Sequence, residues 1–296
     1  MVQGHRRQSR HRATRVEAIR VPLNATSVVD FHSHVGGRQF WTPQVLEQFK
    51  RMNPDFLDSL EELMVPDRLL AFFKSHGIDY AVCIADHSEV TGVVPNEFLL
   101  SFCRGHRELI PFCSVDPHDP RITRMMMSYP ELDRIVGFKL FPTYSYFYPN
   151  DLKLYPFYDF LQSADKIVMF HTGTSSFPGS KSLYGNPLYI EEVAVDFPRL
   201  TIVMAHSGRP FWYQEAFYLS RLHDNLYMDL AGVPPQHLLE YFPKIEANID
   251  RVLFGTDFPT QPKPLRTLVE TVRGLPLRPE SISKILGGNA MRLLRL

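Results

Sequence analysis

Two histidines separated by one residue are the most chemically informative feature of this sequence. His32 and His34 end a mostly apolar stretch that begins at Val28, and Gly36 and Gly37 follow them. In a β-strand, side chains two residues apart point to the same face, so both imidazoles project from one strand end. Two neutral imidazoles on one face can bind a metal ion. A pair cannot complete a metal site, so other segments must supply further ligands.

The same pattern returns at three later places in the chain. His171 and His206 each end an apolar run and have a glycine two residues later, and Asp257 ends another run two residues after Gly255. In a closed barrel of parallel strands, the carboxyl ends of all strands meet at one face. An isolated histidine is most often an ordinary core or surface group, but ionisable residues seldom recur at buried strand ends without a function. We therefore predict that the five side chains converge on one metal-binding pocket.

The strands that must position these residues recur at a regular spacing. Most neighbouring strands begin roughly 25–35 residues apart, which is the length of one strand–helix unit. Their number and spacing predict an α/β fold, a single-domain TIM (β/α)8 barrel over residues 27–296, with the metal site at the carboxyl ends of the strands. A doubly wound open sheet is the alternative, but only a closed ring brings the eighth strand beside the first. The predicted strands are residues 27–34, 80–86, 109–117, 135–142, 166–173, 200–208, 226–232 and 251–259.

A long segment, residues 35–65, separates the first two predicted strands. It contains Phe40, Trp41 and Phe49, and it follows a strand at the end of the barrel where active sites lie. The segment is either an aromatic lid over the site or a plain packing segment, and the sequence does not distinguish between the two.

Composition excludes several classes of protein. The 296 residues include 32 basic and 32 acidic ones, but five arginines fall within residues 1–16, which contain no acid. The rest of the chain therefore has an excess of about five acidic residues, which argues against nucleic-acid binding. No apolar run reaches the length of a membrane span. Three cysteines without CxxC spacing indicate buried free thiols in the cytoplasm, and residues 1–26 are interpreted as a basic, partly disordered extension.

Six short motifs occur in order along residues 27–295. They are Asp30-Phe31-His32-Ser33-His34, Gly137-Phe138-Lys139-Leu140, His171-Thr172-Gly173, Ala205-His206-Ser207-Gly208, Gly255-Thr256-Asp257-Phe258-Pro259 and Gly288-Asn289-Ala290-Met291-Arg292-Leu293-Leu294. With these motifs the chain resembles the amidohydrolase superfamily, and within it the amidohydrolase-2 group. That group includes hydrolases and the non-oxidative decarboxylases that resemble aminocarboxymuconate-semialdehyde decarboxylase.

The resemblance implies a role for each strand-end residue. His32, His34, His171 and Asp257 would ligate one divalent metal ion, usually Zn²⁺, with Mn²⁺ or another first-row metal as the alternative. His206 would be catalytic beside the metal, either polarising a carbonyl or carrying a proton, and Asp257 would also be catalytic through proton transfer. The donor set agrees, because three imidazoles and a carboxylate suit Zn²⁺ and related ions.

Two reactions are open for such a site. In hydrolysis, which we place first, a metal-activated water attacks a C–N or C–O bond of a small organic substrate. In the alternative, a non-oxidative decarboxylation, the metal chelates oxygens of a carboxylated aromatic or muconate-like substrate, and a side chain protonates the carbon that loses CO2. Hydrolysis comes first because the sequence shows no distinct carboxylate-binding site. A metal-dependent nuclease of the TatD kind and a non-catalytic barrel fit the motifs less well.

Four further residues are candidates for substrate binding. Lys139 is either a plain ammonium near the pocket, which we favour, or a carboxylated lysine bridging two metals, as in binuclear amidohydrolases. Arg209 and Trp212 follow the sixth strand, and Arg38 follows the first glycine pair, where an arginine can bind a carboxylate through two hydrogen bonds. Asp229 on the seventh strand is a candidate partner behind a metal ligand. We expect a small-molecule substrate, no nucleic-acid or membrane partner, and a homodimer, which is common in the family.

Overall fold

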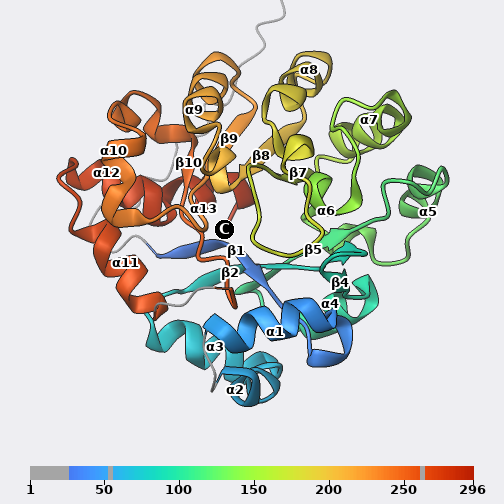
Figure 1. The fold of residues 1–296 in the computed structure, drawn as a ribbon, viewed down its shortest axis with the longest axis horizontal. Coiled ribbons are helices and arrows are strands. Elements are labelled where there is room, and N and C mark those ends of the chain that lie inside the picture. Colours follow the sequence, from blue (N-terminus) through green and yellow to red (C-terminus); the bar gives the residue numbers. More distant parts are fainter. Residues whose placement is uncertain (1–26, 53–55, 261–263) are drawn as a thin grey trace, which may run out of the picture.

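A computed structural model describes residues 27–52, 56–260 and 264–296. Eight parallel strands form one sheet in the order β1-β2-β5-β6-β7-β8-β9-β10, with helices around it (Figure 1). Each predicted strand is present, so the predicted TIM barrel is confirmed, whereas the proposed extension 1–26 lies outside the described residues. The strands are β1 (Val29–His34), β2 (Tyr80–Ile84), β5 (Leu109–Ser114), β6 (Gly137–Leu140), β7 (Ile167–His171), β8 (Thr201–Ala205), β9 (Leu226–Asp229) and β10 (Val252–Leu253).

The last strand returns to the first and nearly closes the ring. The amide of Phe31 donates to the carbonyl of Phe254 at 2.8 Å, and farther along the amide of Asp257 donates to the carbonyl of His32 at 2.8 Å. These bonds place the segment after β10 alongside β1. Asp257 therefore lies next to the histidines of β1, although 225 residues separate it from His32 in the sequence.

Helices alternate with the strands and pack against the outside of the barrel. In α11, Leu265, Leu268, Val269 and Val272 are buried at the spacing of one helix face. None of the described helices combines the length and the apolar composition needed to span a membrane. The α-helices are α1 (Pro43–Met52), α2 (Phe56–Leu63), α3 (Pro66–Ser75), α4 (Asn96–Phe102), α5 (Ile122–Met127), α6 (Pro142–Ser145), α7 (Tyr155–Ser163), α8 (Leu188–Asp196), α9 (Tyr213–Leu222), α10 (Leu238–Tyr241), α11 (Leu265–Arg273), α12 (Pro279–Ser283) and α13 (Asn289–Leu294).

A bulge in β1 adjusts the direction of the two histidines. The pairing of β1 with β2 shifts by one residue between Asp30 and Ser33. The side chains of Val29 and Phe31 belong to the apolar cluster inside the barrel, and strict alternation would send His32 to the other face. Because the bulge inserts one extra residue, His32 can follow Phe31 on the same side. The bulge thus allows the first part of β1 to place apolar side chains inside the barrel and its end to place the histidines there as well.

The insertion after β1 lies over the same end of the barrel. Trp41 lies two residues before α1 and Phe49 lies within it, and both side chains are buried. A short hairpin of β3 (His87–Ser88) and β4 (Gly92–Val93) supports them: Trp41 pairs with Gly92, and the amide of Thr42 donates to the carbonyl of Thr91 at 3.1 Å. The segment packs against the barrel and, as described below, also forms one wall of a cavity.

Asp30 provides a first testable prediction about the closed ring. Its fully buried carboxylate accepts hydrogen bonds from the Thr256 amide at 2.8 Å and the Thr256 hydroxyl at 2.5 Å. Replacing Asp30 with alanine should lower the free energy of unfolding by about 2–4 kcal/mol, because three buried donors lose their acceptor: the two groups of Thr256 and the His32 amide, which donates to Asp30 at 3.1 Å. Urea unfolding measures the change. Asp159→Ala, at an exposed position within α7, is the control and should change it by less than about 0.5 kcal/mol; an equal effect of both variants would contradict the prediction.

Candidate metal centre

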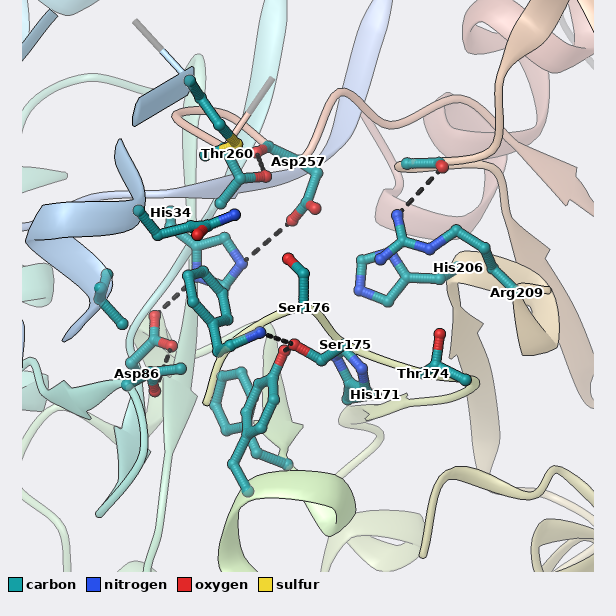
Figure 2. Close-up of a pocket in the computed structure, with 18 of the residues that line it drawn as sticks. His34, Asp86, His171, Thr174, Ser175, Ser176, His206, Arg209, Asp257 and Thr260 are labelled. Carbon is teal, nitrogen blue, oxygen red and sulfur yellow. Dashed lines mark hydrogen bonds and ion pairs between the residues drawn. The ribbon is translucent and has the colours of Figure 1, made fainter. Parts of the chain in front are cut away.

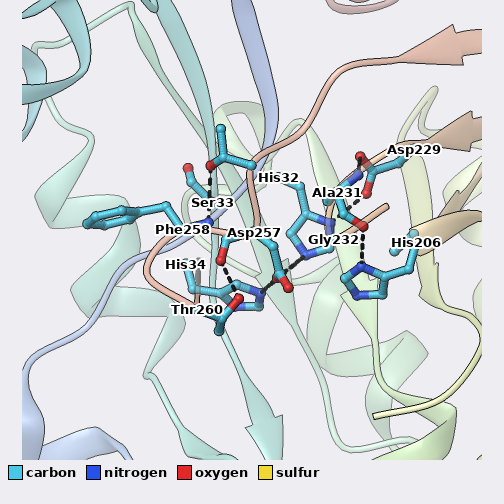
Figure 3. Close-up of polar contacts among 12 residues, drawn as sticks. His32, Ser33, His34, His206, Asp229, Ala231, Gly232, Asp257, Phe258 and Thr260 are labelled. Carbon is cyan, nitrogen blue, oxygen red and sulfur yellow. Dashed lines mark hydrogen bonds and ion pairs between the residues drawn. The ribbon is translucent and has the colours of Figure 1, made fainter. Parts of the chain in front are cut away.

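Three potential ligand atoms form a compact triangle at the carboxyl end of the barrel (Figure 3). The Nε2 atoms of His32 and His34 are 3.2 Å apart. The Oδ1 atom of Asp257 lies 3.5 Å from the former and 3.6 Å from the latter. Donors bound tetrahedrally to one Zn²⁺ ion are separated by about 3.3 Å, given bonds of about 2.0–2.1 Å. The spacing of these three atoms therefore fits a common metal ion.

Carboxylates and a carbonyl behind the histidines fix the direction of each ring. The Nδ1 atom of His32 is 2.6 Å from Oδ2 of Asp229, and Nδ1 of His34 is 2.6 Å from Oδ2 of Asp86. Nδ1 of His206 lies 2.8 Å from the carbonyl oxygen of Ala231. When Nδ1 donates to such an acceptor, Nε2 has its lone pair free for a metal or a substrate. Asp229 thus lies behind a metal-ligand candidate, where it was predicted to lie.

Two further histidines lie next to the triangle. Ligand atoms of His32, His206 and Asp257 all lie within 4.8 Å of one another. His171 is outside that group, but its ring centroid is 4.6 Å from that of His206. The Nε2 atom of His171 is buried and has no hydrogen-bond partner among the described residues. Because a buried nitrogen without a partner is costly, this atom also fits a metal ligand, so the fourth ligand position can be filled by His171 or His206.

Unusual backbone conformations bring the later residues to the site. His206 and Ser207 have φ angles of 63° and 48°, in the left-handed region that residues other than glycine seldom adopt. Asp257 likewise has a φ of 62°. Such conformations persist only where the surrounding structure holds them, and they concentrate at functional sites. At each of these strand ends, the chain bends sharply at the residue that carries the ligand group.

The protonation states of His32, His171, His206 and Asp257 favour metal binding, whereas His34 has to lose a proton when a metal binds. Burial lowers the pKa of three histidines well below the usual value, which leaves them neutral: His32, His171 and His206. Burial also lowers the pKa of His34, but Asp86 and Asp257 outweigh it and raise that pKa to about 9. Burial raises the pKa of Asp257, yet the adjacent histidines outweigh it and hold the pKa well below its usual value. Neutral nitrogens and an ionised carboxylate are the forms that ligate metals.

A cavity of about 530 Å³ opens beside these residues (Figure 2). His34, His171, His206 and Asp257 reach its surface, and Arg209 lines it as well. The segment after β1 contributes a wall through Trp41, Val45, Gln48, Phe49 and Met52. The aromatic residues around the cavity are Trp41, Phe49, Phe141, Tyr144, Phe177, Tyr213 and Tyr241.

The other candidates for substrate binding lie outside the cavity lining. The Nζ atom of Lys139 is fully buried, 3.1 Å from Nε2 of His32, and burial lowers its pKa to about 8. Arg38 extends toward the carbonyl of Leu57 and the carboxylate of Glu61 instead. Trp212 packs beside Phe211 with ring centroids 5.7 Å apart. Of the four candidates, only Arg209 reaches the cavity; direct substrate binding by the other three stays a prediction without support from their positions.

Sequence reasoning missed the role of Asp86. Asp86 follows the apolar run of β2, and the same signal identified the metal-ligand candidates. The histidine that it contacts is His34, 52 residues earlier, and nothing in the local sequence indicates that contact. Its carboxylate also accepts a hydrogen bond from the Thr91 hydroxyl at 3.1 Å, and the Ser88 hydroxyl lies 2.7 Å from that of Thr91. The hairpin of β3 and β4 therefore orients Asp86 toward His34, and that hairpin was not predicted.

A family model described as amidohydrolase (Amidohydro_2) matches residues 29–296. The chain belongs to this amidohydrolase family. It is therefore a member of a family of metal-dependent enzymes. The resemblance that the motifs indicated is thus confirmed. No match was found among curated proteins.

Similar solved structures span nearly the whole barrel. An uncharacterized TIM-barrel protein from Bordetella bronchiseptica is 26% identical, with a TM-score of 0.75 over 91% of this chain and 98% of that chain. A 5-carboxyvanillate decarboxylase from Sphingomonas paucimobilis is 17% identical, with a TM-score of 0.66 over 92% and 100% of the two chains. A dihydroxybenzoic acid decarboxylase from Polaromonas with bound manganese and 2-nitroresorcinol is 16% identical, with a TM-score of 0.68 over 92% and 98%. At these identities, the last two comparisons establish a common fold.

The carboxylates behind the histidines of the candidate metal centre give a second prediction. Asp229→Asn and Asp86→Asn keep the side-chain shape but remove the charge that orients His32 and His34. Each substitution should weaken metal binding by about 10- to 100-fold. Competition with a chromogenic chelator measures the affinity, and the exposed Asp67→Asn is the matched control. Unchanged affinity in both buried variants would show that the two carboxylates do not support the ligands.

Proposed function

We propose that the protein is a metal-dependent, non-oxidative decarboxylase of a small planar carboxylate, such as an aromatic or muconate-like acid. The cavity carries this proposal, because aromatic rings form much of its lining and Arg209 adds a cation near the ligand cluster. Hydrolysis came first from the sequence because it showed no distinct carboxylate-binding site, with Arg38 and Arg209 only as candidates. The position of Arg209 supplies such a group, and we therefore reverse the order of the two reactions.

We propose that His32, His34, His171 and Asp257 hold one divalent metal ion, with Zn²⁺ favoured over Mn²⁺ by the nitrogen-rich donor set. When bound, the ion would act as a Lewis acid toward substrate oxygens. Elemental analysis of the purified protein should give about one metal per chain. Two metals per chain would instead favour the carboxylated form of Lys139.

The residues of the chain can account for proton transfer. Ionised Asp257 accepts the proton of a substrate hydroxyl and returns it to the carbon that loses CO2. The C–C bond breaks, its electron pair remains on that carbon, and the proton forms the new C–H bond. Neutral His206 donates from Nδ1 to Ala231, so its Nε2 is free to accept a proton and can share with Asp257 the transfer of this one proton from the hydroxyl to the carbon. The aromatic walls exclude water from the intermediate.

The names of similar structures support this order of the reactions. Two of the proteins compared above are decarboxylases of hydroxylated aromatic acids by name, and one of them binds manganese. Hydrolysis is kept as the second candidate because of one observation, the ionised Asp257 at the cavity surface. Such a carboxylate can also remove a proton from an attacking water.

A substrate panel separates the two reactions. Metal-loaded protein is incubated with hydroxybenzoates and muconates while CO2 release is measured, and in parallel with esters, lactones and amides while acid release is measured. We expect CO2 from at least one acid and no turnover of the second set. Turnover of an ester, lactone or amide without CO2 release would overturn the decarboxylase in favour of the hydrolase.

We also infer that the enzyme works in the cytoplasm as a homodimer. The free cysteines Cys83, Cys103 and Cys113 are all buried, which fits a reducing compartment. Light scattering tests the second part, since a homodimer has twice the chain mass of 34.2 kDa. A mass of one chain at micromolar concentration would contradict it.

A further inference from the structure

Arg209 is a charged residue with no acidic partner in the described part of the chain. Its Nη1 atom donates to the carbonyl oxygen of Gly232 at 3.0 Å, which occupies one of five guanidinium N–H groups. The nearby carboxylates are engaged elsewhere: Asp229 with His32, Asp86 with His34, and Asp257 with both histidines. The guanidinium thus lines the cavity with most of its donors unused.

Two glycines hold Arg209 in this position. A Cβ atom on Gly232 would lie 1.7 Å from Nη1 of Arg209, so the guanidinium occupies the space that any larger residue would fill. A Cβ atom on Gly173 would lie 2.1 Å from the carbonyl oxygen of Arg209. Gly232 and Gly173 have φ angles of 68° and 83°, which also favour glycine. Both glycines thus leave room for Arg209, and the hydrogen bond from Nη1 to Gly232 orients its guanidinium, which reduces the entropy cost of binding an anion.

Hydroxyl groups that line the same cavity offer additional donors. The amide of Thr174 donates to the carbonyl of Arg209 at 2.6 Å, which ties the loop after β7 to the arginine. Thr174 and Ser176 both line the cavity. Neither hydroxyl has a hydrogen-bond partner among the residues that the structure describes, whereas that of the intervening Ser175 accepts from Tyr144 at 2.8 Å. An anion beside Arg209 would find both a cation and unused hydroxyl donors.

We propose that Arg209, with Thr174 and Ser176, binds a second carboxylate that the substrate retains throughout the reaction, so the substrate is a dicarboxylate. This inference rests on the proposed decarboxylation. The carboxylate that leaves becomes neutral CO2, and an arginine bound to it would stabilise the ground state more than the transition state. A retained carboxylate keeps its charge, so Arg209 can hold it equally in both states and position the reacting end at the ligand cluster.

Binding of simple acids tests the inference without requiring turnover. Metal-loaded protein is titrated calorimetrically with benzoate and with the three benzenedicarboxylates, phthalate, isophthalate and terephthalate. At least one dicarboxylate should bind about 10- to 100-fold more tightly than benzoate, as expected for charged hydrogen bonds. Arg209→Gln should abolish that preference and Arg209→Lys should retain part of it. Arg221→Gln, on the exposed side of α9, is the matched control and should leave it unchanged.

A second variant tests the position of the charge rather than its presence. Gly232→Ala keeps Arg209 but displaces its guanidinium, and should also reduce the preference. Metal content and thermal unfolding verify that each variant is folded and loaded. A preference that survives both Arg209→Gln and Gly232→Ala, or the absence of any preference in the wild type, would overturn the inference.

Kinetics separates this inference from the proposed function. With a decarboxylated substrate, Arg209→Gln should raise KM much more than it lowers kcat, because the interaction is the same in both states. A higher kcat in the variant would place the leaving carboxylate at Arg209 and overturn the inference while the decarboxylase stands. If no acid releases CO2 but dicarboxylate binding still depends on Arg209, the proposed reaction fails and the anion site stands.

Discussion

Replacing His32 and His34 together with alanine is expected to remove the bound metal and to lower turnover by about 10³-fold or more. The two Nε2 atoms and Oδ1 of Asp257 form the compact triangle, so the double variant leaves only one of its three donors. A catalytic metal contributes several kcal/mol of transition-state stabilisation, and each ~1.4 kcal/mol corresponds to a factor of ten in rate. Elemental analysis measures the metal content, and CO2 release measures the rate.

The control for the double variant removes two histidines elsewhere. His106 and His237 have side chains that are 24% and 45% exposed, and neither lines the cavity. His106→Ala/His237→Ala should retain about one metal per chain and full turnover. A His32→Ala/His34→Ala protein that is folded and keeps the wild-type metal content would show that the triangle is not the metal site.

The positions of the candidate ligand residues in the sequence carried most of the information about the site. A strand end is recognisable from its apolar run, and the parallel topology requires that all such ends meet at one face. His171, His206 and Asp257 could therefore be grouped with the β1 histidines before the fold was known. Alternation along β1 correctly indicated that the two histidines lie together, but it could not reveal the bulge that sets their direction, since a bulge depends on pairing with β2.

Residues on the loops were predicted less well, for a physical reason. A loop side chain follows the path of its own segment, and that path is set by contacts distant in sequence. Arg38 is close to the glycines after β1, yet its side chain contacts two residues of α2, the carbonyl of Leu57 and the carboxylate of Glu61. Arg209 reaches the cavity because Gly232, on another loop, leaves room for its guanidinium. Neither outcome is encoded in the residues next to these arginines.

Replacing His206 with alanine is expected to lower turnover by about 10²- to 10⁴-fold while the metal stays bound. The reason is that the carbonyl of Ala231 holds Nδ1 of His206, and a ring nitrogen of His206 lies within 4.8 Å of a ligand atom of Asp257 at the cavity, where a general acid–base group acts. His171→Ala is the informative comparison. Its buried Nε2 has no hydrogen-bond partner in the part of the chain that the structure describes, so this variant should lose metal as well as turnover. Elemental analysis and kcat, measured on both variants, provide the test.

The pair of variants decides which histidine is the fourth ligand. His206 belongs to the three groups within 4.8 Å of one another, so distance alone favours it as a ligand, whereas the unpartnered nitrogen favours His171. If His206→Ala loses the metal and His171→Ala keeps it, the two roles must be exchanged. If His206→Ala keeps both metal and turnover, it has no catalytic role, and proton transfer must rest on Asp257 alone. Partial rescue of His206→Ala by added imidazole, with unchanged metal content, would identify the missing group as a proton carrier rather than a structural support.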